Sequence, residues 1–225
     1  NKIMPDNSYV AAKRFGAVAA NTAAICALQA STGGTTLVLN GSAVGTNKFF
    51  SATSANDGSN MATTVTITSA GGQNNAGITF TITGTDINGA TLSEAGLTGP
   101  GAGATVTTTA AFLTVTAVKP SGTVTGTVSA GFTATSTTQG IVFAGRTRVR
   151  GMHGISVATA GTANFRNTSQ TGDVILALDS SGAVDYIDPY IPDNGTLFKA
   201  GCFLNISNGF GAITVFYDGP NPTGS

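Results

Sequence analysis

The side chains that could take part in chemistry are few, and many of them lie in the C-terminal half of the chain. His153 is the single histidine, and it follows three alternating arginines, Arg146, Arg148 and Arg150. If this segment is a strand, the alternation places all three guanidinium groups on one face. Such a ladder needs carboxylate partners. We interpret it as a salt-bridge seam between subunits, with an ordinary charge ladder on an edge strand as the alternative.

Carboxylates form the second group, and they are the expected partners of the arginines. Five aspartates lie between residues 173 and 193, and the tract 185–195 carries three of them beside Tyr186, Tyr190 and two prolines. This tract could gather oxygens for a calcium ion, but it lacks the EF-hand spacing. A proline-stiffened loop with solvated aspartates is the simpler interpretation. A glycosidase pair would also need an aromatic platform for the sugar, and the chain has no Trp.

No catalytic motif accompanies these residues. His153 has no Gly-x-Ser-x-Gly elbow, no His-Glu-x-x-His and no Walker loop around it, and the glycine-rich segment 99–103 lacks a Lys and a following helix pattern. We interpret His153 as a turn or packing residue. The sequence therefore predicts a protein that is not an enzyme, with no catalytic residue, no cofactor and no metal.

The two cysteines, Cys26 and Cys202, lie far apart in the chain. One pair could form a single disulfide, but it is not a disulfide framework. Cys202 opens the apolar run 202–206, which predicts a buried strand. We expect free, buried thiols, which favour assembly in a reducing cytoplasm.

The charge content excludes several classes of function. Only 9% of the residues are charged, against about a quarter in ordinary domains. Ten basic and ten acidic side chains cancel, so direct binding of nucleic acid through a basic field is not expected. A chain with few charges of either sign tends to associate. We therefore interpret much of the surface as contact surface inside an assembly, with a secreted β domain as the alternative.

The first 34 residues differ from the rest of the chain in composition and in residue pattern. They hold Lys13, Arg14 and an alanine-rich stretch. We predict an arm over 1–34, partly extended and partly a short helix, that orders on a neighbouring subunit. The stretch 13–30 also imitates a secretory signal, but it begins late, and Asn21 and Thr22 interrupt it. No apolar run approaches the length of a membrane span.

Residues 35–132 alternate apolar residues with threonine, most regularly over 64–68, 78–83 and 113–117. This period of two predicts half-buried antiparallel strands. Turn-forming residues separate them, and the segment 84–89 predicts a hairpin after the strand that ends near Thr83. The turn-forming segments are 56–58, 71–75, 86–89 and 99–101.

A Thr-rich linker is predicted over 133–139, followed by a second block of strands. The apolar runs of this block are less diluted by threonine, and turn signals separate them. The predicted fold class is all-β, with two antiparallel β-sandwich or jelly-roll-like domains preceded by an N-terminal arm. The predicted domains are the arm 1–34, a Thr-rich β domain 35–132 and a C-terminal β-sandwich 140–219.

Several of these segments resemble structural proteins of tailed bacteriophages. The similar stretches are 66–72, 76–86, 97–100 and 112–116 in the first block and 164–166, 174–176 and 213–217 in the second. The resemblance covers about residues 36–219. It implies a virion protein with a β domain followed by a sheet-rich domain, and it brings no catalytic residues.

The expected function is a non-enzymatic component of a bacteriophage virion, namely a capsid decoration or cement protein assembled in the host cytoplasm. The expected partners are the major capsid protein and further copies of the chain as a homo-oligomer, without a membrane. The residues expected at interfaces are Lys13, Arg14, Arg146, Arg148 and Arg150. The alternatives are a phage tail component (tube, adaptor or fibre base) and a bacterial surface adhesin or filament subunit.

Overall fold

The computed structural model describes residues 10–16, 21–44, 61–132, 138–192, 194–207 and 209–219. Within these ranges the chain is built of strands β1 to β16, and the strand pairs resolved between them are antiparallel. This confirms the predicted all-β fold class. The same ranges contain no helix that is long and apolar enough to cross a membrane.

The chain divides into two compact units. The C-terminal unit comprises Asn1–Ala17 and Gly140–Ser225, and the threonine-rich unit comprises Val18–Gln139. The prediction of one arm over 1–34 does not agree with this division. Strand β1 (Val10–Gly16) pairs with the last strand of the C-terminal unit, whereas β2 (Asn21–Gln29) pairs inside the threonine-rich unit. Each strand inserts a fully buried side chain, Phe15 or Ile25, into its unit, and the predicted short helix does not occur in the described part of the segment.

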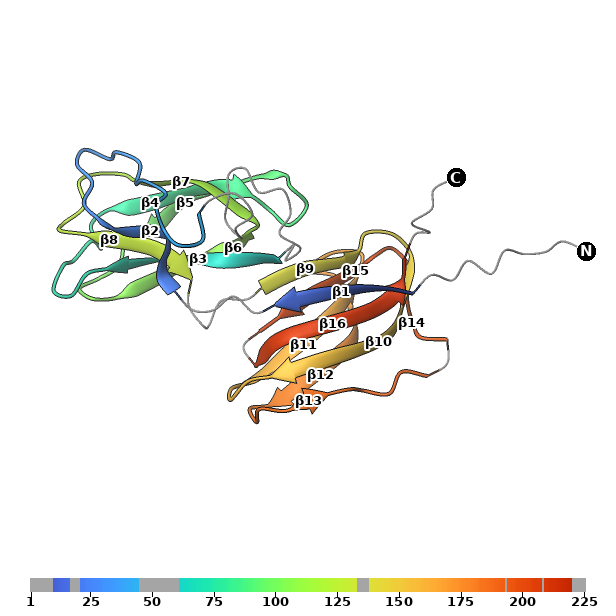
Figure 1. Ribbon diagram of the computed structural model, residues 1–225. Helices are drawn as coiled ribbons and strands as arrows, with labels where there is room; N and C mark the ends of the chain where they lie inside the picture. Colours follow the sequence, from blue (N-terminus) through green and yellow to red (C-terminus); the bar gives the residue numbers. More distant parts are fainter. Residues whose placement is uncertain are drawn as a thin grey trace, which may run out of the picture. The chain divides into compact units, whose positions relative to one another are not determined.

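The threonine-rich unit consists of two groups of strands (Figure 1). In the first group, β2 pairs with β8 (Val128–Phe132), β8 pairs with β3 (Met61–Ser69), and β3 pairs with β6 (Thr105–Phe112). The second is a three-stranded sheet in the order β5 (Thr91–Thr98), β4 (Thr79–Thr85), β7 (Thr114–Pro120). Buried side chains of both groups form one core, including Val65, Ile67, Phe80, Ile82, Phe112, Val118 and Val128.

The predicted hairpin is confirmed. Strands β4 and β5 pair antiparallel, and the Asp86 carboxylate accepts hydrogen bonds from the backbone N–H groups of Asn88 and Ala90 in the turn between them. Phe80 and Ile82 are fully buried, as the alternation predicts. Strand β3 differs from a half-buried strand, because Thr63 and Thr66 are fully buried as well as Val65 and Ile67. The predicted turn at 56–58 lies outside the described residues.

The C-terminal unit also contains two groups of strands. A five-stranded sheet has the order β1, β16 (Phe210–Asp218), β10 (Thr147–Ser156), β13 (Tyr186–Ile187), and β14 (Thr196–Phe198) pairs with the beginning of β10. The other group has the order β12 (Val174–Ser181), β11 (Ala160–Asn167), β15 (Cys202–Ile206), β9 (Thr138–Phe143). Strand β9 begins inside the predicted linker 133–139, of which 133–137 lies outside the described residues.

A β-bulge in β10 sets which side chains of the five-stranded sheet face outward. Val149 pairs with Tyr217 but Gly151 pairs with Phe216, so Arg150 is an extra residue. Before the bulge the odd-numbered residues are buried, and after it the even-numbered residues are buried. The bulge therefore leaves Arg150, Gly151 and His153 on the outer side of the sheet, away from the core.

Candidate functional site

The two basic residues of β1 have different environments because successive side chains of a strand point to opposite faces. Lys13 is half-buried, and its Nζ donates a hydrogen bond to the carbonyl oxygen of Ile141 at 2.6 Å and lies 5.6 Å from the centre of the Phe15 ring. Burial lowers the pKa of the Lys13 ammonium. Lys13 therefore has a structural role within its own unit. Arg14 is exposed on the outer face.

The three predicted arginines do not form one regular ladder. Arg146 precedes β10 and is exposed, whereas Arg148 and Arg150 flank the buried Val149. Arg148 Nη1 donates to the backbone oxygen of Asn194 at 3.1 Å. Arg150 Nε donates to Asp218 Oδ1 at 2.7 Å.

The carboxylate that the structure describes against Arg150 is Asp218, which does not belong to the aspartate-rich tract expected to supply it. Asp218 lies on β16, next to β10, and the bulge brings Arg150 within reach of it. The two side chains are about equally shielded from solvent, at 29% and 28% exposure. The pair fixes the end of the sheet inside one subunit.

His153 lies on the outer face of β10, and no pattern in the sequence indicates its partners. Its Nδ1 is 2.6 Å from Asp188 Oδ1, and its ring stacks on Tyr186 with centroids 5.6 Å apart. The β10–β13 pairing creates this contact, because it places Ile155 opposite Tyr186 and Gly154 opposite Ile187. The interpretation of His153 as a turn or packing residue is therefore incomplete: it belongs to a strand and makes a polar pair.

The His153–Asp188 pair has the composition of a base and its orienting carboxylate, but its setting differs from that of a catalytic pair. The side chains are 37% and 66% exposed, so water screens the interaction. Within the described ranges no hydroxyl or thiol is hydrogen-bonded to the ring as a nucleophile would be. The arrangement can form hydrogen bonds and one ion pair across an interface.

The acidic tract does not gather its oxygens at one point in the described part of the chain. Asp185 Oδ1 accepts the backbone N–H of Tyr186, and Asp188 faces His153. Ser156 holds the preceding loop by donating to the backbone oxygens of Ala183 and Asp185. No group of three or more histidine, cysteine, aspartate or glutamate side chains in the described ranges could hold a metal ion. Asp193 lies outside those ranges.

Both cysteines are free and buried, as predicted from the sequence. Burial raises the pKa of the Cys26 thiol to about 12, and it raises the pKa of the Cys202 thiol as well. Because the thiolate is the reactive form, neither side chain is suited to nucleophilic chemistry.

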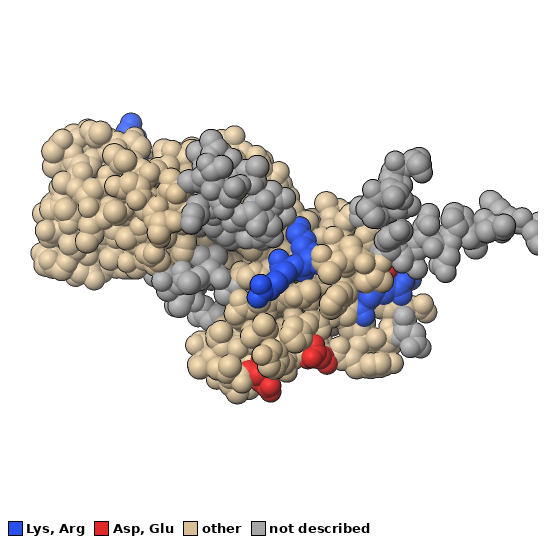
Figure 2. All heavy atoms as spheres, in the orientation of Figure 1, with Lys and Arg blue, Asp and Glu red and all other residues tan. Residues whose placement is uncertain are grey.

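The threonine-rich unit has a nearly uncharged surface, most of which is tan in the view of Figure 2. Its described residues contain three charged side chains: Asp86, Glu94 and Lys119. Asp86 caps the hairpin turn, and Glu94 accepts hydrogen bonds from the backbone N–H groups of Thr109 and Ala110 at 3.0 and 2.8 Å. Both carboxylates therefore serve the backbone, and Lys119 is exposed.

Hydroxyl groups predominate on the outer side of the three-stranded sheet, which also carries the exposed Lys119 opposite Thr81. We call the set Thr79, Thr81, Thr83, Ser93 and Thr116 the threonine face. Three of the four threonines of β4 alternate with the buried Phe80 and Ile82, and Ser93 and Thr116 belong to the two neighbouring strands. The threonine face is wettable, and it carries hydroxyl groups that can donate and accept hydrogen bonds.

The fold and these surfaces define an all-β protein with polar and mixed faces available for contact. No family model, no curated protein and no solved structure matches the chain.

Proposed function

We propose that the chain is a non-enzymatic structural component of a bacteriophage virion, a decoration protein that binds to the capsid and to copies of itself. The observation that carries the proposal is the nearly uncharged surface of the threonine-rich unit, in which Asp86 and Glu94 are bound to backbone N–H groups. Such a surface has little electrostatic repulsion to keep copies apart.

The physical role of a decoration protein fits such a surface. Contacts made by hydroxyl groups and small apolar side chains are individually weak, because water competes for each hydrogen bond. Repetition over a symmetric shell turns many weak contacts into a strong attachment. Burial of apolar surface adds about 25 cal/mol per Å² at each contact. The shell then resists the outward pressure of packaged DNA.

The environments of the chemically capable residues agree with a binding role. Lys13 and Arg150 are paired within the C-terminal unit, and the His153–Asp188 pair is open to solvent. Arg14 and Arg146 are the exposed members of the predicted interface set. We propose that they contact neighbouring subunits.

The first experiment measures the amount of the protein relative to the major capsid protein in purified particles. A decoration protein is expected in a ratio close to that of the capsid protein. A small fraction of that amount would place the protein in the tail, and absence from particles would overturn the virion assignment.

A second experiment tests the surface that carries the proposal. Thr83→Lys adds a charge to the threonine face, at a half-buried position beside Ser93. We expect it to lower the occupancy of the protein on particles at least about tenfold, which corresponds to about 1.4 kcal/mol. The control is Ser181→Lys, at an exposed position at the end of β12, which should leave the occupancy unchanged. Equal binding by both variants would exclude this surface.

A further inference from the structure

The outer face of the five-stranded sheet carries opposite charges at its two edges. Arg14 on β1 pairs with Thr214 on β16, Thr214 pairs with His153 on β10, and His153 contacts Asp188 just beyond β13. This row runs straight across four strands. The cation and the carboxylate at its ends are about 14 Å apart, because neighbouring strands are separated by about 4.8 Å. In Figure 2 one group of basic side chains lies near β1, a second lies at the end of the sheet near β14, and acidic side chains lie toward β13.

In the two rows on either side of this one, the two halves of the face differ in the size of their side chains. In one row Phe216 on β16 lies beside Gly151 on β10, and the Phe216 ring is 3.7 Å from the position that a Cβ of Gly151 would take. In the other row Gly16 and Ala212 stand on the β1 side, and Ile155 and Tyr186 stand on the β13 side. Large residues on one half of the face therefore correspond to small residues on the other half.

A two-fold axis parallel to the strands, between β16 and β10, exchanges the two halves. Under this operation β1 of one copy faces β13 of the other, and β16 faces β10. Arg14 then faces Asp188, and Thr214 faces His153. A two-fold axis perpendicular to the strands would instead place β1 over β1 and would not bring Arg14 to Asp188.

The same operation matches the side chains by size and by charge. The Phe216 rings of the two copies, each of which lies against its own Gly151, face each other beside the axis, Ile155 faces the buried Ala212, and Tyr186 faces Gly16. In the outermost row, Asp218 faces a second Arg150. Self-complementarity of this kind is what an isologous interface requires.

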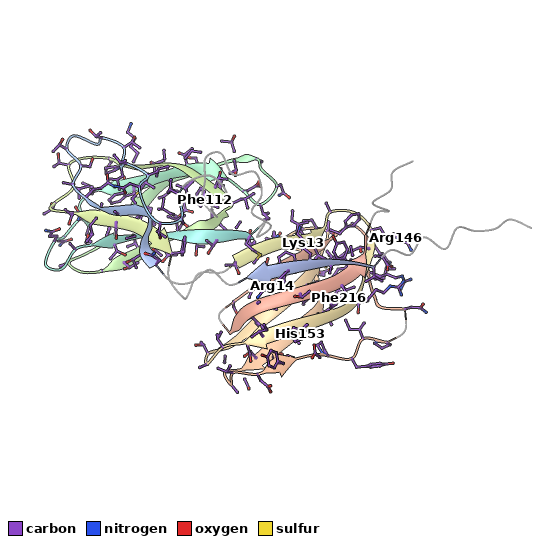
Figure 3. The ribbon with its side chains drawn as sticks, in the orientation of Figure 1. Lys13, Arg14, Phe112, Arg146, His153 and Phe216 are labelled. Carbon is purple, nitrogen blue, oxygen red and sulfur yellow. The ribbon has the colours of Figure 1, made fainter. Side chains whose placement is uncertain are left out.

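We propose that the outer face of the five-stranded sheet is a two-fold interface with a second copy of this chain, in which Arg14 of each copy pairs with Asp188 of the other. The exposed residues support it: Val10 is 54% exposed, Tyr186 69% and Phe216 39%. Arg14, Phe216 and His153 mark three adjacent strands of this face in Figure 3. The inference rests on the proposed function, since it names one neighbour that covers the protein in the assembly.

The size of the face sets the expected affinity. Four strands at about 4.8 Å and seven residues at about 3.3 Å cover roughly 20 by 23 Å of each copy. This area is at the lower end for specific interfaces, so we expect a dissociation constant on the order of micromolar. Two sheets packed in this way keep their strands within about 30° of each other.

The test is a charge exchange followed by sedimentation velocity over a range of protein concentrations. Arg14→Glu alone places two carboxylates together at each end of the interface, and Asp188→Lys alone places two cations together. Each single variant is expected to weaken self-association at least about tenfold. An equimolar mixture of the two single variants is expected to form a heterodimer, because every facing pair is again of opposite charge. The double variant, with both substitutions in one chain, should dimerise by itself for the same reason.

The control carries the same charge change away from the rows. Lys199→Glu, at an exposed position between β14 and β15, should leave the association unchanged. Equal weakening by Lys199→Glu, failure of the mixture to associate, or a monomeric wild-type chain at the highest concentration would overturn the proposal. Circular dichroism of each variant separates these results from misfolding, and recovery in the mixture cannot occur unless both variants are folded.

The two proposals can fail separately. A protein abundant in particles but monomeric in solution, with no effect of the charge exchange, would refute the two-fold interface and leave the decoration role intact. A dimer with the expected charge-exchange behaviour, but absent from particles, would refute the decoration role alone.

Discussion

Replacement of Glu94 tests whether the scarce charges of the threonine-rich unit serve the backbone. Strand β6 departs from β3 between the pairs Thr64–Ala111 and Thr66–Thr107, and the backbone N–H groups of the bulged residues lose their ladder partners. The two Glu94 oxygens, from β5, accept the N–H groups of Thr109 and Ala110 at 3.0 and 2.8 Å.

The expected cost follows from these two bonds. Hydrogen bonds to a charged group contribute about 1.5–3 kcal/mol each, and the partial exposure of Glu94 reduces this value. We expect Glu94→Ala to lower the free energy of unfolding by about 2–4 kcal/mol. Glu94→Gln keeps one acceptor oxygen and the length of the side chain, so we expect a loss of about 1–2 kcal/mol.

The assay is urea unfolding followed by two signals. Far-UV circular dichroism reports on both units, whereas the fluorescence of the four tyrosines reports on the C-terminal unit, to which all of them belong. The Glu94 variants should shift the first signal and leave the second unchanged. Lys119→Gln, at an exposed position, is the control. A Glu94→Ala variant within about 0.5 kcal/mol of wild type, the range of ordinary surface substitutions, would refute the reasoning.

Alkali should destabilise the threonine-rich unit through Cys26, whose thiol has a pKa raised to about 12 by burial. The folded state retains the thiol proton that the unfolded state releases above about pH 9, so the free energy of unfolding falls as the pH rises from 9 toward 12. We expect a loss of about 1.4 kcal/mol by pH 10, measured by urea unfolding. The Cys26→Ala variant should not show this loss. A thiol reagent should label neither Cys26 nor Cys202 in the native protein and both in denaturant; rapid labelling of the native protein would show that they are not buried. Gly84→Ala should destabilise the protein by about 1–3 kcal/mol, because a Cβ there would lie 1.8 Å from the backbone oxygen of Thr114. Gly77→Ala, with no atom within 4 Å of its Cβ, is the control, and equal unfolding midpoints would contradict the contact.

Local alternation predicted three strands of the threonine-rich unit, and apolar runs predicted several strands of the C-terminal unit. The run Ile78–Thr83 overlaps β4, with Phe80 and Ile82 buried, and the apolar run that starts at Cys202 forms β15. The same pattern could not predict that both faces of β3 are buried. Threonine is compatible with either environment, because its methyl group packs in a core while its hydroxyl group serves a wet surface.

The features that define the candidate site depend on pairing between distant segments. An extra residue at Arg150 leaves no mark in the sequence, yet it decides which side chains of β10 face outward. The His153–Asp188 contact spans 35 residues and follows from the register of β10 with β13. The pairing of the N-terminal segment also depends on tertiary structure, because β1 and β2 pair with strands that come much later in the chain.

The charged residues are divided unequally between the two units. Five of the twenty charged residues lie within Val18–Gln139, and fifteen lie in the C-terminal unit. A nearly neutral, hydroxyl-rich surface tolerates many partners, because hydroxyl groups donate and accept alike. Charges at opposite edges of a sheet favour one orientation of a partner, because other alignments separate the opposite charges or bring like charges together. If the protein decorates a shell as proposed, the threonine-rich unit is suited to binding the shell, and the C-terminal unit is suited to fixing the orientation of neighbouring copies.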